Sequence, residues 1–146
     1  MESNLQKFLD AQEQTYAQAL AEIKVGRKTG HWMWFIFPQV AGLGQSPTSV
    51  YYAIQDYKEG KEYLQHPVLG GRLNEIYEVL FSLPGTSAED IFGSTDAMKL
   101  RSSLTLFGLA DYSESDVFSR LIDKYFNNYP DQVTIELLSN EFTNPE

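Results

Sequence analysis

The chain has 146 residues, of which 20 are acidic and 11 basic, giving a formal net charge of −9. Hydrophobic residues make up 42% of it, enough apolar side chain to bury a core, which excludes a disordered or low-complexity chain. The acidic balance argues against nucleic acid as a partner, because phosphates repel an acidic surface. The length predicts a single domain over residues 1–146.

The cysteine and histidine content limits the chemistry. With no cysteine, disulfides, thiol catalysis and cysteine-ligated metal sites are excluded. Two histidines are too few for a histidine-rich metal site, so we predict no metal and no cofactor. No signal peptide is visible, and the apolar run at residues 32–38 is far shorter than the roughly 20 residues that span a bilayer. We therefore expect a soluble, cytoplasmic protein without membrane contact, and the oligomeric state stays open.

The first predicted element is an amphipathic helix. Apolar residues recur at steps of three and four from Leu5 to Ile23, and Gly26 follows as a stop. Ser3 and Gln6 have the spacing of a capping box at its start. This pattern predicts a helix with one face in the core.

The next segment, residues 31–38 (HWMWFIFP), is apolar on every side after its histidine. Periodicity leaves open whether it is a buried strand or a buried helical turn. The difference matters because Trp32 and Trp34 would share a face on a strand and diverge on a helix. A glycine-punctuated loop at residues 41–45 follows.

Ser46 followed by Pro47 predicts the start of another helix, and apolar residues continue on one face as far as Tyr57. Gly60 either breaks this helix or separates it from a short one that ends at Leu64. Later helices are predicted to begin at caps or turns at His66, Ser87, Thr95 and Ser115, with a last helix over residues 131–138. Five or more helical patterns predict a compact, all-α, multihelical domain with extended loops.

The densest group of unusual side chains lies at residues 28–39. It contains Lys28, His31, Trp32, Trp34 and Gln39. Indole rings anchor a core or stack on a flat ligand, so one interpretation is a stacking wall with Lys28 and His31 as anion contacts. Core packing, with a hydrogen-bonded histidine, is the alternative.

A second group begins where the turn at residues 93–96 enters a helix, since backbone N–H groups at helix starts bind anions. Lys99, Ser102 and Ser103 follow at spacings that place them on one face. In the alternative interpretation, the two hydroxyls bond back to carbonyls of their own helix. Both interpretations stay open at this point.

A third group contains His66 and Arg72. His66 precedes a proline, and we interpret it as a structural turn residue. An isolated histidine more often makes hydrogen bonds within the fold than takes part in catalysis. Arg72 is the better ligand-binding candidate, because a guanidinium pairs bidentately with phosphate or carboxylate.

Together these groups suggest a pocket for an anionic, nucleotide-like small molecule, with aromatic stacking and cationic donors. Hydrolysis of a compound derived from NAD or ADP-ribose would use His31 as general acid or base and Asp96 to orient or activate water. Because no motif of bond cleavage is present, the sequence does not decide whether the protein is an enzyme. The alternative is a non-enzymatic protein-interaction module in which the same aromatic residues belong to the core.

Three stretches resemble the DUF1810 family of uncharacterised proteins. They are residues 26–47, with the run HWMWFIFPQ; residues 66–73 (HPVLGGRL); and residues 91–107, with the run DAMKLRSS. The resemblance implies a compact, mainly helical fold with extended loops, and it implies no particular activity. Some members carry a calpastatin label, which does not suit this composition, because an inhibitor of that kind is a disordered chain.

Overall fold

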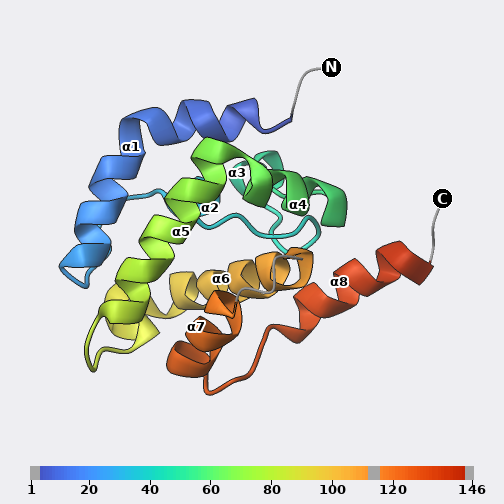
Figure 1. The fold of residues 1–146 in the computed structure, drawn as a ribbon. Coiled ribbons are helices and arrows are strands. Elements are labelled where there is room, and N and C mark those ends of the chain that lie inside the picture. The colour runs from blue at the N-terminus through green and yellow to red at the C-terminus, as the bar shows by residue number, and fades with distance from the viewer. Residues whose placement is uncertain (1–3, 112–115, 144–146) are drawn as a thin grey trace.

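A computed structural model describes residues 4–111 and 116–143. Within these residues the chain forms eight helices and one isolated β-bridge, and no extended strand (Figure 1). The helices are α1 (Gln6–Lys24), α2 (Met33–Ile36), α3 (Pro47–Tyr51), α4 (Tyr57–Gln65), α5 (Pro67–Ser82), α6 (Ala88–Ala110), α7 (Val117–Phe126) and α8 (Gln132–Thr143). The predicted all-α, multihelical fold is confirmed.

The helices pack around α5 and α6. Helix α1 contacts α2 and α5, α4 contacts α5 and α6, and α7 contacts both α5 and α6. Helix α8 packs on α6, and its far end projects from the rest of the molecule (Figure 1). One continuous cluster of buried side chains runs from Phe8 in α1 through Tyr77 in α5 to Leu138 in α8. In the part of the chain that the structure describes, no helix combines the length and apolar character that crossing a membrane requires.

Local capping chemistry sets several helix starts, as the sequence predicts. The Ser46 hydroxyl accepts the Ser49 N–H at 3.1 Å and begins α3. Ser87 and Asp90 form a reciprocal capping box at the start of α6. His66 begins α5, where its Nδ1 accepts two backbone N–H groups of the first turn, so its structural interpretation is confirmed.

Helix α1 also begins and ends close to the predicted positions. Gly26, two residues after the helix, has φ 80°, a left-handed conformation that favours glycine and turns the chain away. The predicted caps at Ser3 and Ser115 lie outside the described residues.

The prediction of a continuous helical face as far as Tyr57 is wrong. Helix α3 ends at Tyr51, and Ile54 pairs in parallel with Val40. The Ile54 N–H donates to the Gln39 carbonyl at 2.8 Å, and the Ile54 carbonyl accepts an N–H at the same distance. This pairing buries Ile54 completely, and that long-range gain outweighs the local helical pattern.

Gly60 breaks no helix, contrary to prediction, and lies inside α4. A Cβ atom at this position would lie 3.3 Å from the Cβ atom of Ala110. Gly60 is therefore placed where α4 and α6 approach each other closely, which is a packing role that sequence spacing does not reveal.

Candidate functional site

Helix α6 is broken at Gly93, near the turn that the sequence predicts. Gly93 has φ 80° and ψ 163°, a combination essentially restricted to glycine. The Ile91 carbonyl accepts the backbone N–H of Lys28 at 2.7 Å, so the loop after α1 is paired with the broken turn. The helix then restarts at the exposed residues Ser94 and Thr95. A restarted helix presents the N–H groups of its first turn, and such groups favour anions.

The loop that meets this break is held by the carboxylate of Glu22 on α1. Glu22 Oε1 accepts the N–H of Thr29 at 2.8 Å, the N–H of Gly30 at 3.0 Å and the indole N–H of Trp32 at 2.8 Å. The side chain of Gln18 donates to the second oxygen at 2.8 Å. Burial raises the pKa of Glu22, but these hydrogen bonds outweigh burial and lower the pKa to about 2.

The two tryptophans diverge, because residues 33–36 form the short helix α2 and not a strand. Trp32 is fully buried, with ring contacts to Phe37 and Phe92. Trp34 is half-buried. The core interpretation therefore holds for Trp32, and Trp34 is the indole that a ligand can reach.

Asp96 lies between two lysines. Lys28 Nζ is 2.7 Å from one carboxylate oxygen and also donates to the Gly30 carbonyl at 2.6 Å. Lys99 Nζ is 3.5 Å from the other oxygen and 5.3 Å from the ring centroid of Trp34. The Lys28 side chain is 9% exposed and that of Lys99 is 26% exposed, so Lys99 is the more accessible cation. We call Lys99, Trp34 and the helix restart at residues 93–96 the Lys99 site.

Trp34 and Gln39 also line a small hollow. The hollow has a volume of about 10 Å³, which is room for about one water molecule. Its other walls come from Val40, Gly44, Ser49 and Tyr52. A ligand that stacks on Trp34 must therefore lie on an open surface.

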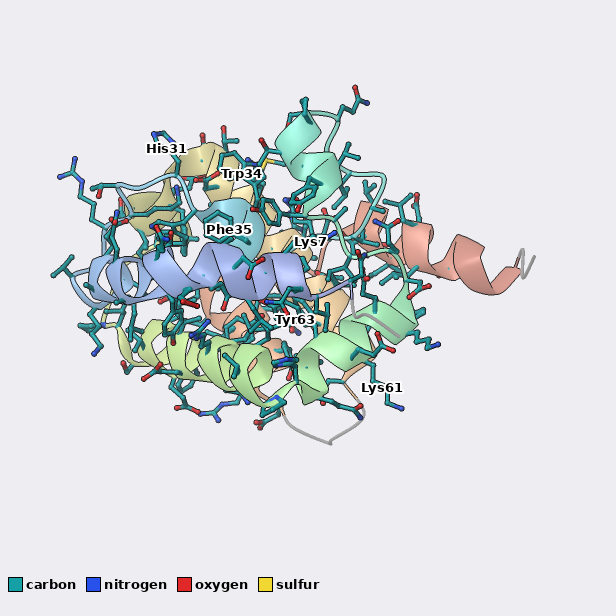
Figure 2. All side chains as sticks on the ribbon, turned by 90° about the horizontal axis from the view of Figure 1, so that it is seen from above. Lys7, His31, Trp34, Phe35, Lys61 and Tyr63 are labelled. Atoms are coloured by element: carbon teal, nitrogen blue, oxygen red, sulfur yellow. The ribbon has the colours of Figure 1, made fainter. Side chains whose placement is uncertain are left out.

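His31 is exposed, and it lies on the same side of α1 as Trp34 (Figure 2). The ionic partners that the structure gives Asp96 are Lys28 and Lys99. The pairing of His31 with Asp96 in acid–base chemistry stays a prediction. Across the described residues, no three Asp, Glu or His side chains are grouped so that they could hold a metal ion.

Arg72 lies in a different polar cluster, between α1, α4 and α5. Its Nη1 donates to Gln12 Oε1 at 3.2 Å, and its guanidinium carbon is 5.3 Å from the ring centroid of Tyr16. The Gln12 amide donates to the hydroxyl of Tyr63 at 2.9 Å. Tyr63 lies on the opposite side of α1 from Trp34 (Figure 2). The expected convergence of Arg72 with Lys99 is therefore not found, because helix packing directs Arg72 into the α1–α5 interface.

The two serines of α6 are buried in the helix packing and offer no accessible hydroxyl beside Lys99. Ser102 is buried, and its hydroxyl donates to the Met98 carbonyl of its own helix at 3.1 Å, as in the alternative interpretation. Ser103 is fully buried.

The sequence analysis did not identify Glu22 as a site residue, because an acidic residue on an amphipathic helix is normally interpreted as a charge exposed to solvent.

The comparisons with known proteins agree with the resemblance seen in the sequence. The family model described as "Protein of unknown function (DUF1810)" matches residues 2–138. The crystal structure of the conserved hypothetical protein Rv1873 from Mycobacterium tuberculosis at 1.38 Å is similar to this chain, with 43% sequence identity and a TM-score of 0.90. The similarity covers 93% of this chain and 96% of that chain. No curated protein matches. The chain therefore belongs to the DUF1810 family.

Proposed function

We propose that the protein binds a small, phosphate-bearing molecule of the nucleotide type at the Lys99 site. The observation that carries this proposal is the position of the Lys99 ammonium, which lies over a half-buried indole and belongs to the helix that restarts after Gly93. Lys28 and Lys99 carry two positive charges against the single Asp96 carboxylate between them, while the nearby Glu22 carboxylate is occupied by its own hydrogen bonds. Lys99, the more accessible cation, is the group that favours an anion here.

The two lysines have different roles in this proposal. Lys28 has close contacts with Asp96 and with the Gly30 carbonyl, so it positions the loop against the helix. Lys99 is 3.5 Å from Asp96, longer than a charge-assisted hydrogen bond of about 2.7–2.9 Å. A phosphate group gains hydrogen bonds from Lys99 and from the first-turn N–H groups of the restarted helix.

Trp34 supplies the site for the planar part of the ligand. Stacking of a base on an aromatic side chain contributes about 1–3 kcal/mol. Gln39, which lines the same small hollow as Trp34, carries an amide that offers a donor and an acceptor to the ligand. Because the hollow has room for about one water molecule, the ligand stays exposed on one side and binds weakly.

The contacts support binding more directly than bond cleavage. Two ammonium groups share the Asp96 carboxylate, so Asp96 acts as an electrostatic organiser of the lysines. Hydrolysis would require His31 and Asp96 to meet around a bound ligand. Catalysis therefore stays a separate hypothesis, which a binding measurement does not decide.

Thermal unfolding with added phosphate, AMP or NAD tests the proposal on three proteins: wild type, Lys99→Met and Lys58→Met. Lys58 is an exposed lysine on α4 and serves as the matched control. A ligand at 100 times its Kd stabilises the protein by about 2.7 kcal/mol, which raises its melting temperature. We expect AMP to raise the melting temperature of wild type and Lys58→Met, and to have little effect on Lys99→Met. The proposal fails if no probe stabilises the wild type, or if Lys99→Met responds as the wild type does.

A protein-interaction module is the second candidate. It is favoured by Met98, which is 66% exposed and directly precedes Lys99, because an exposed apolar side chain beside a cation suits a protein contact. This candidate predicts that none of the three probes stabilises the wild type. The same titration therefore separates the two candidates.

A further inference from the structure

A second hollow, which shares no residue with the Lys99 site, opens between α6, α7, the segment that leads to α8 and the start of α8. Its volume is about 300 Å³. Among the described residues, six with apolar side chains line it: Leu104, Leu109, Phe118, Ile122, Pro130 and Ile135. This is about twice the volume of the roughly 150 Å³ apolar cavity that takes up benzene, and it lies at the low end of the range for ligand pockets.

Hydrogen bonds fix the backbone of residues 129–131, which runs along the hollow, to α6. Arg101 donates to the carbonyl of Tyr129 at 2.7 Å and to that of Pro130 at 3.2 Å. Thr105 Oγ1 accepts the N–H of Asp131 at 2.9 Å. These contacts hold residues 129–131 in place, so the hollow exists before any ligand arrives.

The other end of the hollow is set by two backbone features. A Cβ atom at Gly108 would lie 3.2 Å from the Cβ atom of Phe118, so α6 and α7 approach each other closely there. Asn127 and Asn128 both have positive φ, 53° and 67°, and they turn the chain sharply at the end of α7. Gly108, Phe118 and Asn128 all line the hollow, so the close approach and the sharp turn form its boundary here.

The polar groups of the lining indicate which molecules fit. Among the lining residues, Asn128 and Ser119 carry side-chain amide and hydroxyl groups, and Asp111 carries a carboxylate. The Ser119 hydroxyl donates to the carbonyl of Asp116 and keeps its acceptor capacity. A carboxylate in the lining of an acidic protein disfavours anions, and the apolar walls disfavour strongly hydrated groups.

We propose that this hollow is a binding site for an uncharged, mainly apolar small molecule about the size of a two-ring aromatic, with one polar group. The proposal is independent of the function proposed for the Lys99 site. A protein partner fits less well, because eleven of the residues that the structure describes line the hollow, whereas a specific protein interface uses roughly 20–30 residues on each side.

Indole and indole-3-carboxylate test the proposal as a neutral probe and its anionic counterpart. The isoleucine methyl NMR signals of the wild-type protein report binding, since Ile122 and Ile135 line the hollow. We expect indole to shift these two signals in a saturable manner. We expect indole-3-carboxylate to bind at least threefold more weakly. The absence of saturable shifts, or equal affinity for both probes, would overturn the proposal.

Two variants locate the binding. Ser119→Phe places a ring at the edge of the hollow, and Ser82→Phe is the matched control, because both serines are exposed and both hydroxyls donate to a carbonyl three residues earlier. Indole should bind Ser82→Phe as it binds the wild type and should bind Ser119→Phe at least tenfold more weakly. Equal affinity for both variants would overturn the proposal. So would methyl shifts that follow protein concentration without indole, because they would identify a second copy of the chain as the occupant.

Discussion

The Lys99 site and the Arg72 cluster contain the same pairing, a cation 5.3 Å from the centroid of an aromatic ring. Arg72 makes this contact between packed helices, where its guanidinium also satisfies Gln12, a side chain that is 2% exposed. Lys99 makes it at a helix break, beside a half-buried indole and a carboxylate 3.5 Å away. The difference is that the Arg72 pair is tied into the packing of the fold, whereas the Lys99 pair stays partly exposed, and the proposed binding rests on that exposure.

The largest expected difference between the two regions is in stability. Arg72→Met removes the donor to Gln12 Oε1 and leaves a buried acceptor unsatisfied, which should cost about 2 kcal/mol. Lys99→Met removes a partly exposed contact and should change the free energy of unfolding by less than about 0.5 kcal/mol. Urea unfolding of the two variants measures both values. Equal losses would show that Lys99 is as structural as Arg72.

A smaller effect is expected at the helix break itself. Gly93→Ala places a side chain at φ 80° and should cost about 1 kcal/mol through backbone strain alone, since a Cβ atom there would meet no neighbouring atom within 4 Å. Gly71→Ala is the control. Gly71 lies inside α5 with equally open space, and alanine there should stabilise the protein by about 0.5–1 kcal/mol. If Gly93→Ala also stabilises the protein, the break is not enforced by this residue.

The last expected effect concerns Glu22 and is read from the loss of stability in acid. Its pKa in the folded protein is about 2, below the ordinary value of 4.5. Its contribution to stability is therefore complete above about pH 4.5 and is lost as the pH falls towards 2. Urea unfolding between pH 5 and pH 2 should show the wild type losing more stability than Glu22→Gln. Parallel curves for the two proteins would mean that the hydrogen bonds of Glu22 do not hold the loop.

Local sequence signals predict much of the fold. Ser46, His66 and Ser87 begin helices as predicted, because an N-cap acts through atoms within three residues of itself. The turn before Asp96 marks the break in α6 for the same reason, since Gly93 adopts a conformation that other residues avoid.

Features that depend on distant residues could not be predicted in this way. Ile54 leaves the helical pattern because it pairs with Val40. The candidate site shows the same limit. Trp32 is fixed by Glu22 on another element, and Arg72 is turned towards Gln12 by the packing of α5 on α1. Spacing along the chain identifies the residue types that bind anions, but helix packing decides which of them meet.

The two indole N–H signals in an NMR titration with AMP test the central claim most directly. Trp32 is fully buried and its indole N–H is bonded to Glu22, whereas Trp34 lies beneath Lys99. We predict that AMP shifts the Trp34 indole signal together with the backbone amides of Ser94 and Thr95, and leaves the Trp32 indole signal in place. Shifts confined to the surroundings of Arg72, or no shift at saturating AMP, would contradict the assignment of the Lys99 site as the ligand-binding region.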